Sequence, residues 1–277
     1  MIKEKKYILA VIGLGNMGGA LLSGIINSNF LKKEKIAVYD IDSLKVKKFA
    51  DFFNVKTLPC LKEVVLNAKY ILLAVKPQNI PEILADIKEV LSENDNVILS
   101  IAAGLSTQFF EKNIGNIGVI RIMPNSPALY GKGISAISCG RFVCEDDKKF
   151  AAKLMKNVGE VIFIDEKYQH IATVLSGSGP AYFFLFCKLM TDFGITHGLD
   201  DETAKKMVTG TMIGAGEIMI NSKEQINDLI KSVASPGGTT QQALDKFKAD
   251  NLQKIFSDAL EAALNRSMEL ESAVSGK

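Results

Sequence analysis

The sequence has few of the residues on which several classes of enzyme depend. It contains two histidines, His170 and His197, and neither lies in a motif. A serine or cysteine hydrolase needs a histidine partner for its nucleophile, and the Ser-Gly-Ser-Gly segment at 176–179 lacks the G-x-S-x-G order of a nucleophile elbow. A hydrolase of this kind is therefore disfavoured, and both histidines are expected to be surface or structural residues.

The cysteines show no pattern of metal ligands. There are four, far apart or at spacings that fit no common zinc motif: Cys60, Cys139, Cys144 and Cys187. No metal site is predicted, and the cysteines are expected to be reduced structural thiols in a cytoplasmic protein.

Long apolar runs and a strong excess of one charge are also missing. No apolar stretch is long and uninterrupted enough to be expected to span a bilayer, and the charged N-terminus, which leads straight into a strand, predicts no secretory signal. The formal net charge of +2, with lysine and arginine scattered, gives no reason to expect a nucleic acid or membrane partner. Since 47% of the 277 residues are hydrophobic, the chain can bury a large core and is expected to form two domains.

The first part of the chain alternates between strand-like and helix-like patterns. This alternation predicts an α/β fold, a Rossmann-type doubly wound parallel sheet with helices on both faces, over residues 1–164. The expected strands are 7–12, 36–39, 70–75, 97–101 and 118–122, with 134–138 and 161–164 extending the sheet, and the expected helices include 17–27, 44–53 and 81–91.

After about Asp165 the strand signals stop, and residues 165–277 are predicted to form a second, all-α domain. One helix is expected to begin near Pro180, and another to follow the acidic residues 200–202 and run toward Ile220. Glycine costs an isolated helix about 1 kcal/mol relative to alanine. Another helix is therefore expected to approach closely where the second helix has three glycines: Gly210, Gly214 and Gly216.

A glycine-rich loop follows the first expected strand, and its residues are Gly13, Leu14, Gly15, Asn16, Met17 and Gly18. In the order strand, G-x-G-x-x-G, helix, the first glycine permits a tight turn, the second lets the backbone approach a pyrophosphate, and the third lets helix and strand pack closely. Asp40 ends the second expected strand, near the expected distance of about 20 residues. The pattern predicts dinucleotide binding.

A second glycine-rich segment, Ser-Pro-Gly-Gly-Thr-Thr at 235–240, precedes the helix-like run 241–247. The first N–H groups of a helix have no intrahelical partners, and the positive end of the helix dipole attracts anions, so this segment is suited to a carboxylate or phosphate. The alternative is a glycine-proline linker followed by a threonine N-cap.

Taken together, these motifs make the chain similar to the pyrroline-5-carboxylate reductase family over almost its whole length. Five segments carry the resemblance, and their order matches the family: 13–18 (Gly-Leu-Gly-Asn-Met-Gly), 74–78 (Ala-Val-Lys-Pro-Gln), 121–127 (Arg-Ile-Met-Pro-Asn-Ser-Pro), 176–182 (Ser-Gly-Ser-Gly-Pro-Ala-Tyr) and 235–240. The resemblance implies hydride transfer from NAD(P)H to the C=N bond of 1-pyrroline-5-carboxylate, which gives L-proline. It also implies a homodimer or higher homo-oligomer that assembles through the helical domain.

The resemblance assigns roles to particular residues. The substrate carboxylate is expected to be held by Ser235 and by the backbone N–H groups of Gly238, Thr239 and Thr240. Thr240 is the expected catalytic residue, since its hydroxyl can hydrogen-bond the ring nitrogen and orient the imine. Ser178, with its neighbouring glycines, is expected to form the opposite wall near the nicotinamide.

On the cofactor side, the 13–18 loop is expected to hold the pyrophosphate of NADP(H) or NAD(H). The resemblance places the nicotinamide riboside against Ala74, Val75, Lys76 and Pro77, and Asn125 is expected to bond the carboxamide or brace its loop. A carboxylate at Asp40 repels a 2′-phosphate and so favours NADH, although the nearby Lys45 and Lys47 leave NADPH open.

Three alternatives are kept. A β-hydroxyacid dehydrogenase would use a helical lysine, for which Lys188 is a candidate, but it would give the 235–240 segment no role. A non-catalytic NAD(P)-binding sensor would need the 13–18 loop and not 235–240. Another cyclic imine reductase remains open, because the motifs do not define the size of the substrate ring.

Overall fold

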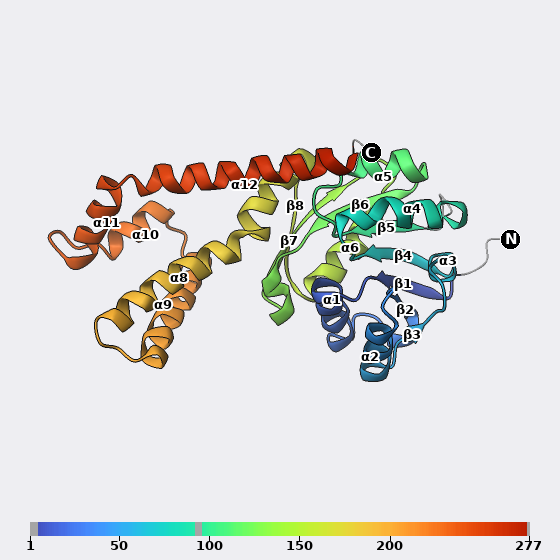
Figure 1. The fold of residues 1–277 in the computed structure, drawn as a ribbon, viewed down its shortest axis with the longest axis horizontal. Helices are drawn as coiled ribbons and strands as arrows, with labels where there is room; N and C mark the ends of the chain where they lie inside the picture. Colours follow the sequence, from blue (N-terminus) through green and yellow to red (C-terminus); the bar gives the residue numbers. More distant parts are fainter. Residues whose placement is uncertain (1–4, 92–95, 276–277) are drawn as a thin grey trace. The chain divides into compact units, whose positions relative to one another are not determined.

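The computed structural model describes residues 5–91 and 96–275. Contacts within the chain divide it into two compact units, whose residues can be found by colour on the ribbon of Figure 1. The first unit comprises the chain up to Ser178 together with the stretch from Leu264 onward, and the second comprises Gly179–Ala263.

An eight-stranded sheet forms the centre of the first unit, in the order β3-β2-β1-β4-β5-β6-β7-β8. Its strands are β1 (Tyr7–Ile12), β2 (Ile36–Tyr39), β3 (Lys56–Thr57), β4 (Ala68–Leu73), β5 (Val97–Ser100), β6 (Gly118–Met123), β7 (Gly133–Cys139) and β8 (Gly159–Phe163). The Rossmann-type sheet is confirmed. The strand β3, which was not predicted, is two residues long, too short to show an alternating pattern.

One expectation about the sheet is wrong, because it is not parallel throughout. Strand β7 pairs antiparallel with β6, whereas all the other neighbouring strands pair in parallel. The physical reason is the connection: β6 and β7 are joined through the short turn Ser126–Tyr130, and a parallel pair would need a crossover of a dozen residues or more.

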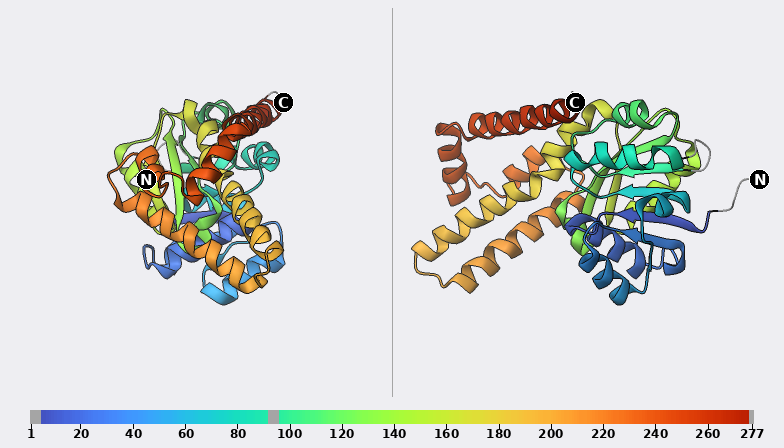
Figure 2. Two further views of the ribbon diagram at one scale, coloured as in Figure 1. Left: turned by 90° about the vertical axis from the view of Figure 1, so that its left-hand side faces the viewer. Right: turned by 45° about the vertical axis from the view of Figure 1, so that its right-hand side comes forward.

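Helices cover both faces of the sheet, as the views in Figure 2 show. One apolar core lies between the sheet and helices α1 (Asn16–Asn27), α2 (Ser43–Phe53) and α6 (Glu145–Lys156). The other lies between the sheet and α3 (Leu61–Leu66), α4 (Ile80–Ile87) and α5 (Thr107–Ile114). The strands of the middle of the sheet consist mainly of apolar residues because both of their faces are buried.

The first unit also includes short helical segments that follow the sheet in the sequence. They are the 3-10 turn Glu166–Tyr168, α7 (Gln169–Ala172) and a π-helix at Thr173–Gly177. The last turns of α12 (Leu252–Ser275) belong to this unit as well. The grouping differs from the predicted division at residue 165, because the buried Gln169 donates its amide to Ala136 O at 3.3 Å and Ser138 Oγ at 2.9 Å of β7.

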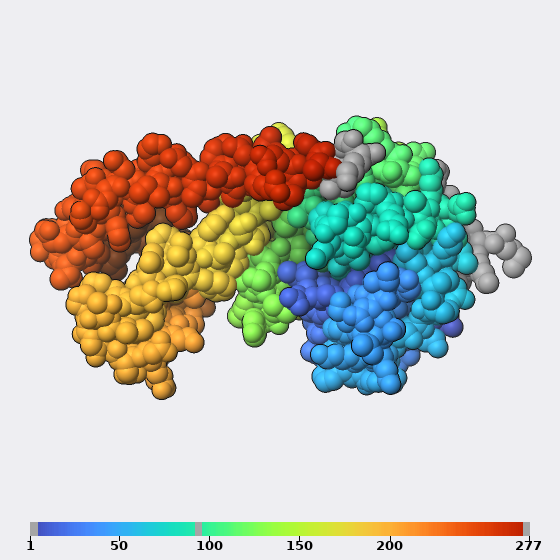
Figure 3. All heavy atoms as spheres, in the orientation of Figure 1, coloured from blue at the N-terminus to red at the C-terminus, as the bar shows by residue number. Residues whose placement is uncertain are grey.

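The second unit contains only helices: α8 (Gly179–Thr196), α9 (Asp201–Asn221), α10 (Ile226–Ser232), α11 (Thr239–Ala249) and the first part of α12. Helices α8 and α9 pack side by side, and their surfaces meet in Figure 3. They approach closely where a Cβ added to Gly194 would lie 3.2 Å from the Ala204 Cβ.

The expectation for the three glycines of α9 is not met within the described chain. A Cβ added at any of them would have no neighbouring atom within 4 Å: Gly210, Gly214 and Gly216. The reason is that α9 buries Ala204 and Val208 against the rest of its unit, and the glycines lie further along the helix.

The second unit leaves large apolar side chains on its surface. On α8, Phe183, Phe184 and Phe193 are 63%, 62% and 66% exposed.

The continuous helical run Glu166–Thr196 is long and apolar enough, by length and composition alone, to cross a bilayer. By this criterion, the expectation that the chain has no such stretch is not met.

Candidate active site

The glycine-rich loop connects β1 to α1, and its three glycines have different surroundings. Gly13 has a φ of +96°, and a Cβ there would lie 2.5 Å from Ala74 O. A Cβ on Gly18 would lie 2.1 Å from Gly13 O, whereas one on Gly15 would have no atom within 4 Å. Gly13 and Gly18 are therefore required by the fold, and the space in front of Gly15 is open to a ligand.

The N-terminus of α1 is free to bind an anion. Its N-cap is Gly15, which has no side chain, and the first turn contains no acidic residue. The first intrahelical bond runs from the Gly19 N–H to Gly15 O at 2.8 Å, so the N–H groups of Asn16, Met17 and Gly18 precede it. These donors, together with the helix dipole, fit a pyrophosphate.

Asp40 lies at the end of β2 and is bonded to the glycine loop itself. Its Oδ2 accepts from the Leu14 N–H at 2.7 Å, and its Oδ1 accepts from the Asp42 N–H at 2.9 Å. The sequence motif marked Asp40 as a ribose ligand but gave no signal of its bond to Leu14, which is 26 residues away. The carboxylate thus helps to fix the loop and also keeps a negative charge beside it.

The segment after β4 adjoins the same loop. The Ala74 N–H donates to Ile12 O at 2.8 Å, and a Cβ on Gly13 would lie 2.8 Å from the Val75 side chain. Lys76 is exposed, and Pro77 begins a 3-10 turn. The structure therefore brings Ala74 and Val75 together with Gly13, and Ala74 also together with Gly18.

Asn125 braces its own loop. It is 8% exposed, and its Oδ1 accepts from the Ile134 N–H of β7 at 2.9 Å. Asn125 was expected either to bond the nicotinamide carboxamide or to brace its loop, and this hydrogen bond corresponds to the second role.

Ser178 ends the π-helix that follows α7. Its N–H donates to Thr173 O at 2.8 Å, which is a bond between residues five apart. A Cβ on the preceding Gly177 would lie 3.5 Å from the Met123 Sδ at the end of β6. This segment therefore stands beside β6, in the same unit as the glycine loop.

The segment 235–240 lies in the second unit and forms a tight turn into α11. Gly237 has a φ of +73°, and the Gly238 N–H donates to Ser235 O at 2.9 Å. This N–H, which the sequence predicted as a substrate donor, is thus already used within the turn. A Cβ on Gly238 would lie 2.4 Å from the Ser235 Oγ, so the close approach of these residues requires glycine.

The N-terminus of α11 resembles that of α1. Its N-cap is Gly238, so the alternative interpretation of a threonine N-cap is wrong. The first intrahelical bond runs from the Gln242 N–H to Gly238 O at 3.1 Å, and the N–H groups of Thr239 and Thr240 precede it. Thr239 is exposed and Thr240 is half-buried, and the free N–H groups at the positive end of the helix dipole are suited to an anion.

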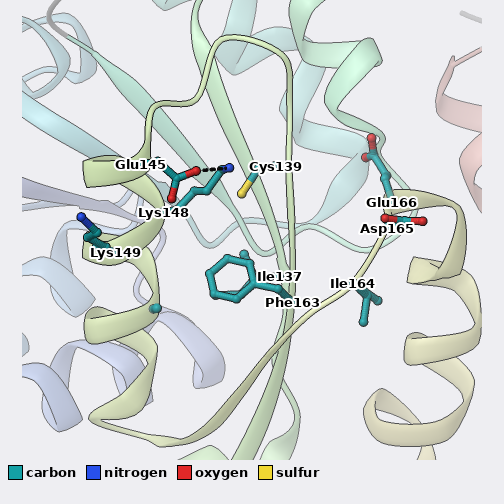
Figure 4. A pocket seen from close by; sticks show the side chains of 10 residues that line it. Ile137, Cys139, Glu145, Lys148, Lys149, Phe163, Ile164, Asp165 and Glu166 are labelled. Atoms are coloured by element: carbon teal, nitrogen blue, oxygen red, sulfur yellow. Dashed lines mark hydrogen bonds and ion pairs between the residues drawn. The ribbon is translucent and has the colours of Figure 1, made fainter.

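Two other features of the described chain, a hollow of the first unit and Lys188, do not fit the predicted active site. A hollow of about 640 Å³ lies beside α6 and β8 (Figure 4), but none of the predicted site residues lines it. Its Lys148 is paired with Glu145 at 2.6 Å, and burial raises the pKa of its Cys139 thiol, which disfavours a reactive thiolate. Lys188, the candidate of the dehydrogenase alternative, pairs with Asp192 at 2.5 Å on the exposed surface of α8.

Comparisons with known proteins identify the family to which the chain is similar. A family model described as pyrroline-5-carboxylate reductase dimerisation matches residues 166–270, and one described as NADP oxidoreductase, coenzyme F420-dependent, matches residues 8–104. The chain is 34% identical to the pyrroline-5-carboxylate reductase of Haemophilus influenzae over 268 residues, which cover 96% of this chain and 98% of that protein.

Solved structures are similar over the same length. A pyrroline-5-carboxylate reductase from Coxiella burnetii is 33% identical with a TM-score of 0.89, and the match covers 96% of this chain and 99% of that one. The Plasmodium falciparum pyrroline carboxylate reductase, solved with NADP bound, is 30% identical with a TM-score of 0.87, and the match covers 98% of this chain and all of that one (100%).

Proposed function

The chain belongs to the pyrroline-5-carboxylate reductase family, and from this premise we propose which of its residues carry the reaction. It is an NAD(P)H-dependent oxidoreductase that reduces the C=N bond of 1-pyrroline-5-carboxylate to give L-proline. We assign cofactor binding to residues 1–164 and substrate binding and dimerisation to residues 165–277.

The observation that carries the assignment is the pair of helix N-termini, each entered through glycine and without a capping side chain. Hydride transfer to this imine involves two anionic groups, the pyrophosphate of the cofactor and the carboxylate of the substrate. The N-terminus of α1 suits the first, and the N-terminus of α11 suits the second.

At α11, the substrate carboxylate accepts from the N–H groups of Thr239 and Thr240 and from the hydroxyl of Ser235. Gly238 shapes the turn, because its own N–H is bonded to Ser235 O. This modifies the role that the sequence suggested for Gly238 from donor to spacer.

Thr240 acts at the reacting bond. This residue is half-buried, and its hydroxyl hydrogen-bonds the ring nitrogen and orients the imine, which reaches the site already protonated in part. When bound, NAD(P)H supplies the hydride that the imine carbon accepts. Gly177 and Ser178 form the wall on the nicotinamide side, where the small residues leave room for the flat ring.

Asp40 sets the choice of cofactor. Its carboxylate is held beside the loop by the Leu14 N–H and can accept from a ribose hydroxyl, but it repels a 2′-phosphate. We therefore infer that the enzyme uses NADH faster than NADPH.

The second unit provides the interface with a second copy of the chain. Residues 166–270 match the dimerisation model, and within them Phe183, Phe184 and Phe193 are more than 60% exposed. Burying each such side chain against a partner contributes roughly 1.5–3 kcal/mol. A protein partner thus explains the apolar surface of α8, and we expect a cytoplasmic homodimer or higher homo-oligomer.

The test follows the oxidation of NADH and NADPH by absorbance with pyrroline-5-carboxylate, together with the formation of proline. Thr240→Ala should lower kcat by about 10²-fold, typical of the loss of one donor at a reacting centre, and leave NADH affinity nearly unchanged. Thr239→Ala is the matched control, because it removes a neighbouring exposed hydroxyl and should stay close to wild type.

The opposite pattern refutes the assignment. If Thr240→Ala lost NADH binding and kept its rate per bound cofactor, Thr240 would belong to the cofactor site. Tight binding of NADH without oxidation by the wild type would favour the sensor or a different imine.

A further inference from the structure

Two consecutive residues of α7 bond this short helix to two different elements, β7 and α12. Gln169 is fully buried and donates to Ala136 O and Ser138 Oγ of β7. The imidazole of His170 faces α12, where its Nδ1 lies 2.9 Å from Ser267 Oγ and its Nε2 lies 2.5 Å from Glu271 Oε2. A helix of four residues is thereby held between strand β7 and the last turns of a helix about 100 residues later in the sequence.

The contact with Glu271 belongs to a cluster of charges. The buried Arg121 of β6 is 2% exposed, and its Nη1 lies 3.4 Å from Glu166 Oε1 and 4.0 Å from Glu271 Oε1. Glu166 also accepts from the N–H and the hydroxyl of Thr107, at 2.7 and 2.5 Å. Two carboxylates thus share one guanidinium, and His170 is a further partner of Glu271.

The same turn of α12 also packs on the loop after β5. Gly104 has a φ of +71°, and a Cβ there would lie 3.3 Å from the Glu271 backbone nitrogen. The turn of α12 at Glu271 therefore touches this loop, Arg121 of β6 and His170 of α7, all within the first unit.

The π-helix begins directly after α7. The Thr173 hydroxyl donates to Gln169 O at 2.8 Å, and the Ser178 N–H closes the π-turn on Thr173 O. Turns of this kind are rare, and they are frequently found at functional sites. Since the turn starts where α7 ends, a shift of α7 moves Gly177 and Ser178 with it.

We propose that His170 is a positioning residue for the reduction. By joining α7 to Ser267 and Glu271 of α12, it fixes the π-turn and so places Gly177 and Ser178, the wall on the nicotinamide side. This inference rests on the proposed function, which assigns that wall. His170 thus acts on the reaction through Gly177 and Ser178 and does not itself contact the substrate.

The test compares His170→Ala with His197→Ala. His197 is the other histidine of the chain and is exposed in the second unit, with its Nδ1 2.8 Å from Phe193 O. A displacement of about 1 Å at a site can cost about 10²-fold in rate, so His170→Ala should lower kcat by roughly 10- to 100-fold. The NADH dissociation constant should change by less than about threefold, because the 13–18 loop keeps its own contacts, and His197→Ala should match the wild type.

A rescue separates positioning from loss of packing. The side-chain amide of His170→Gln can take the place of Nε2 and donate to Glu271, whereas that of His170→Asn reaches only toward Ser267. His170→Gln should recover most of kcat and His170→Asn should not. If His170→Ala does not fold, as judged by circular dichroism, the kcat values of His170→Gln and His170→Asn decide whether His170 has a positioning role.

The outcomes separate the two proposals. If the wild type does not reduce pyrroline-5-carboxylate, the proposed function fails. If the wild type is active but His170→Ala turns over as fast as His197→Ala, or if the Gln and Asn variants have equal kcat, the positioning role of His170 is overturned.

Discussion

Replacing Gly18 by alanine should destabilise the protein, whereas replacing Gly15 should weaken cofactor binding without a loss of stability. A Cβ at position 18 would lie 2.1 Å from Gly13 O and 2.9 Å from the Ala74 Cβ. The first of these atoms is backbone, so relief requires the loop itself to move. A Cβ at position 15 would meet no atom within 4 Å.

The two substitutions therefore differ in free energy. Overpacking of this kind costs about 1–3 kcal/mol, and alanine inside a helix returns about 0.5–1 kcal/mol relative to glycine. Gly18→Ala should lower the free energy of unfolding by about 1–2 kcal/mol. Gly15 has ordinary N-cap dihedrals, φ −70° and ψ −170°, so the effects on the cap and on the unfolded chain should nearly cancel to within about 0.5 kcal/mol.

The methyl group of Gly15→Ala would instead occupy the path of the pyrophosphate. We expect the NADH dissociation constant to rise at least tenfold, which is about 1.4 kcal/mol of binding free energy. Urea unfolding and titration of NADH fluorescence measure the two quantities on each variant. The reasoning would be refuted if Gly15→Ala bound NADH as tightly as the wild type, or if Gly18→Ala were as stable as the wild type.

Four further predictions follow from other parts of the chain. Asp40→Ser should raise the NADPH-to-NADH ratio of kcat/KM by about tenfold or more, because it removes a charge that repels the 2′-phosphate; an unchanged ratio would show that Asp40 only fixes the loop. Burial alone would raise the pKa of Asp147, but hydrogen bonds from Cys144 and Tyr70 and the nearby Lys69 outweigh it and lower that pKa. The resulting stability is present above the unfolded pKa of about 3.9 and is lost as the pH falls through the lower folded pKa. The cost of Asp147→Asn, about 1.5 kcal/mol at neutral pH, should therefore shrink toward zero in unfolding curves as the pH is lowered through this range. Phe183→Asp should shift the oligomer toward monomer in sedimentation experiments, while Tyr130→Asp, at a residue 86% exposed in the first unit, should not; equal behaviour of the two would argue against α8 as the interface. Lys188→Ala should keep wild-type kcat, since Lys188 is paired with Asp192 on the surface, and a large loss would revive the dehydrogenase alternative.

The strands and the two helix starts entered through glycine could be predicted because their signals are local. β1 and β2 lie at the residues expected, since a strand buried on both faces is a continuous apolar run. The glycine spacing at 13–18 and 235–240 likewise depends on backbone geometry within a few residues. Glycine at 13 and 237 marks a positive φ, which other residues rarely adopt.

Features that depend on distant residues gave no local signal. The antiparallel direction of β7 depends on how the chain returns after β6, and the bond of Asp40 to Leu14 depends on the pairing of β1 and β2. The hydrogen bond from the Gly238 N–H to Ser235 O could not be predicted from composition, because the same residues also permit a turn in which this N–H is free.

The sequence by itself determined the order of the elements, the Rossmann-type sheet, the helical second half and the two helix starts entered through glycine, since each rests on periodicity or on the dihedral angles of a few neighbouring residues. Only the tertiary structure decided that β7 pairs antiparallel with β6, that Asp40 accepts from the Leu14 N–H, and that His170 meets Glu271 across 101 residues. The physical reason is that backbone preference acts along the chain, whereas crowding, burial and charge pairing act between residues that only folding brings together.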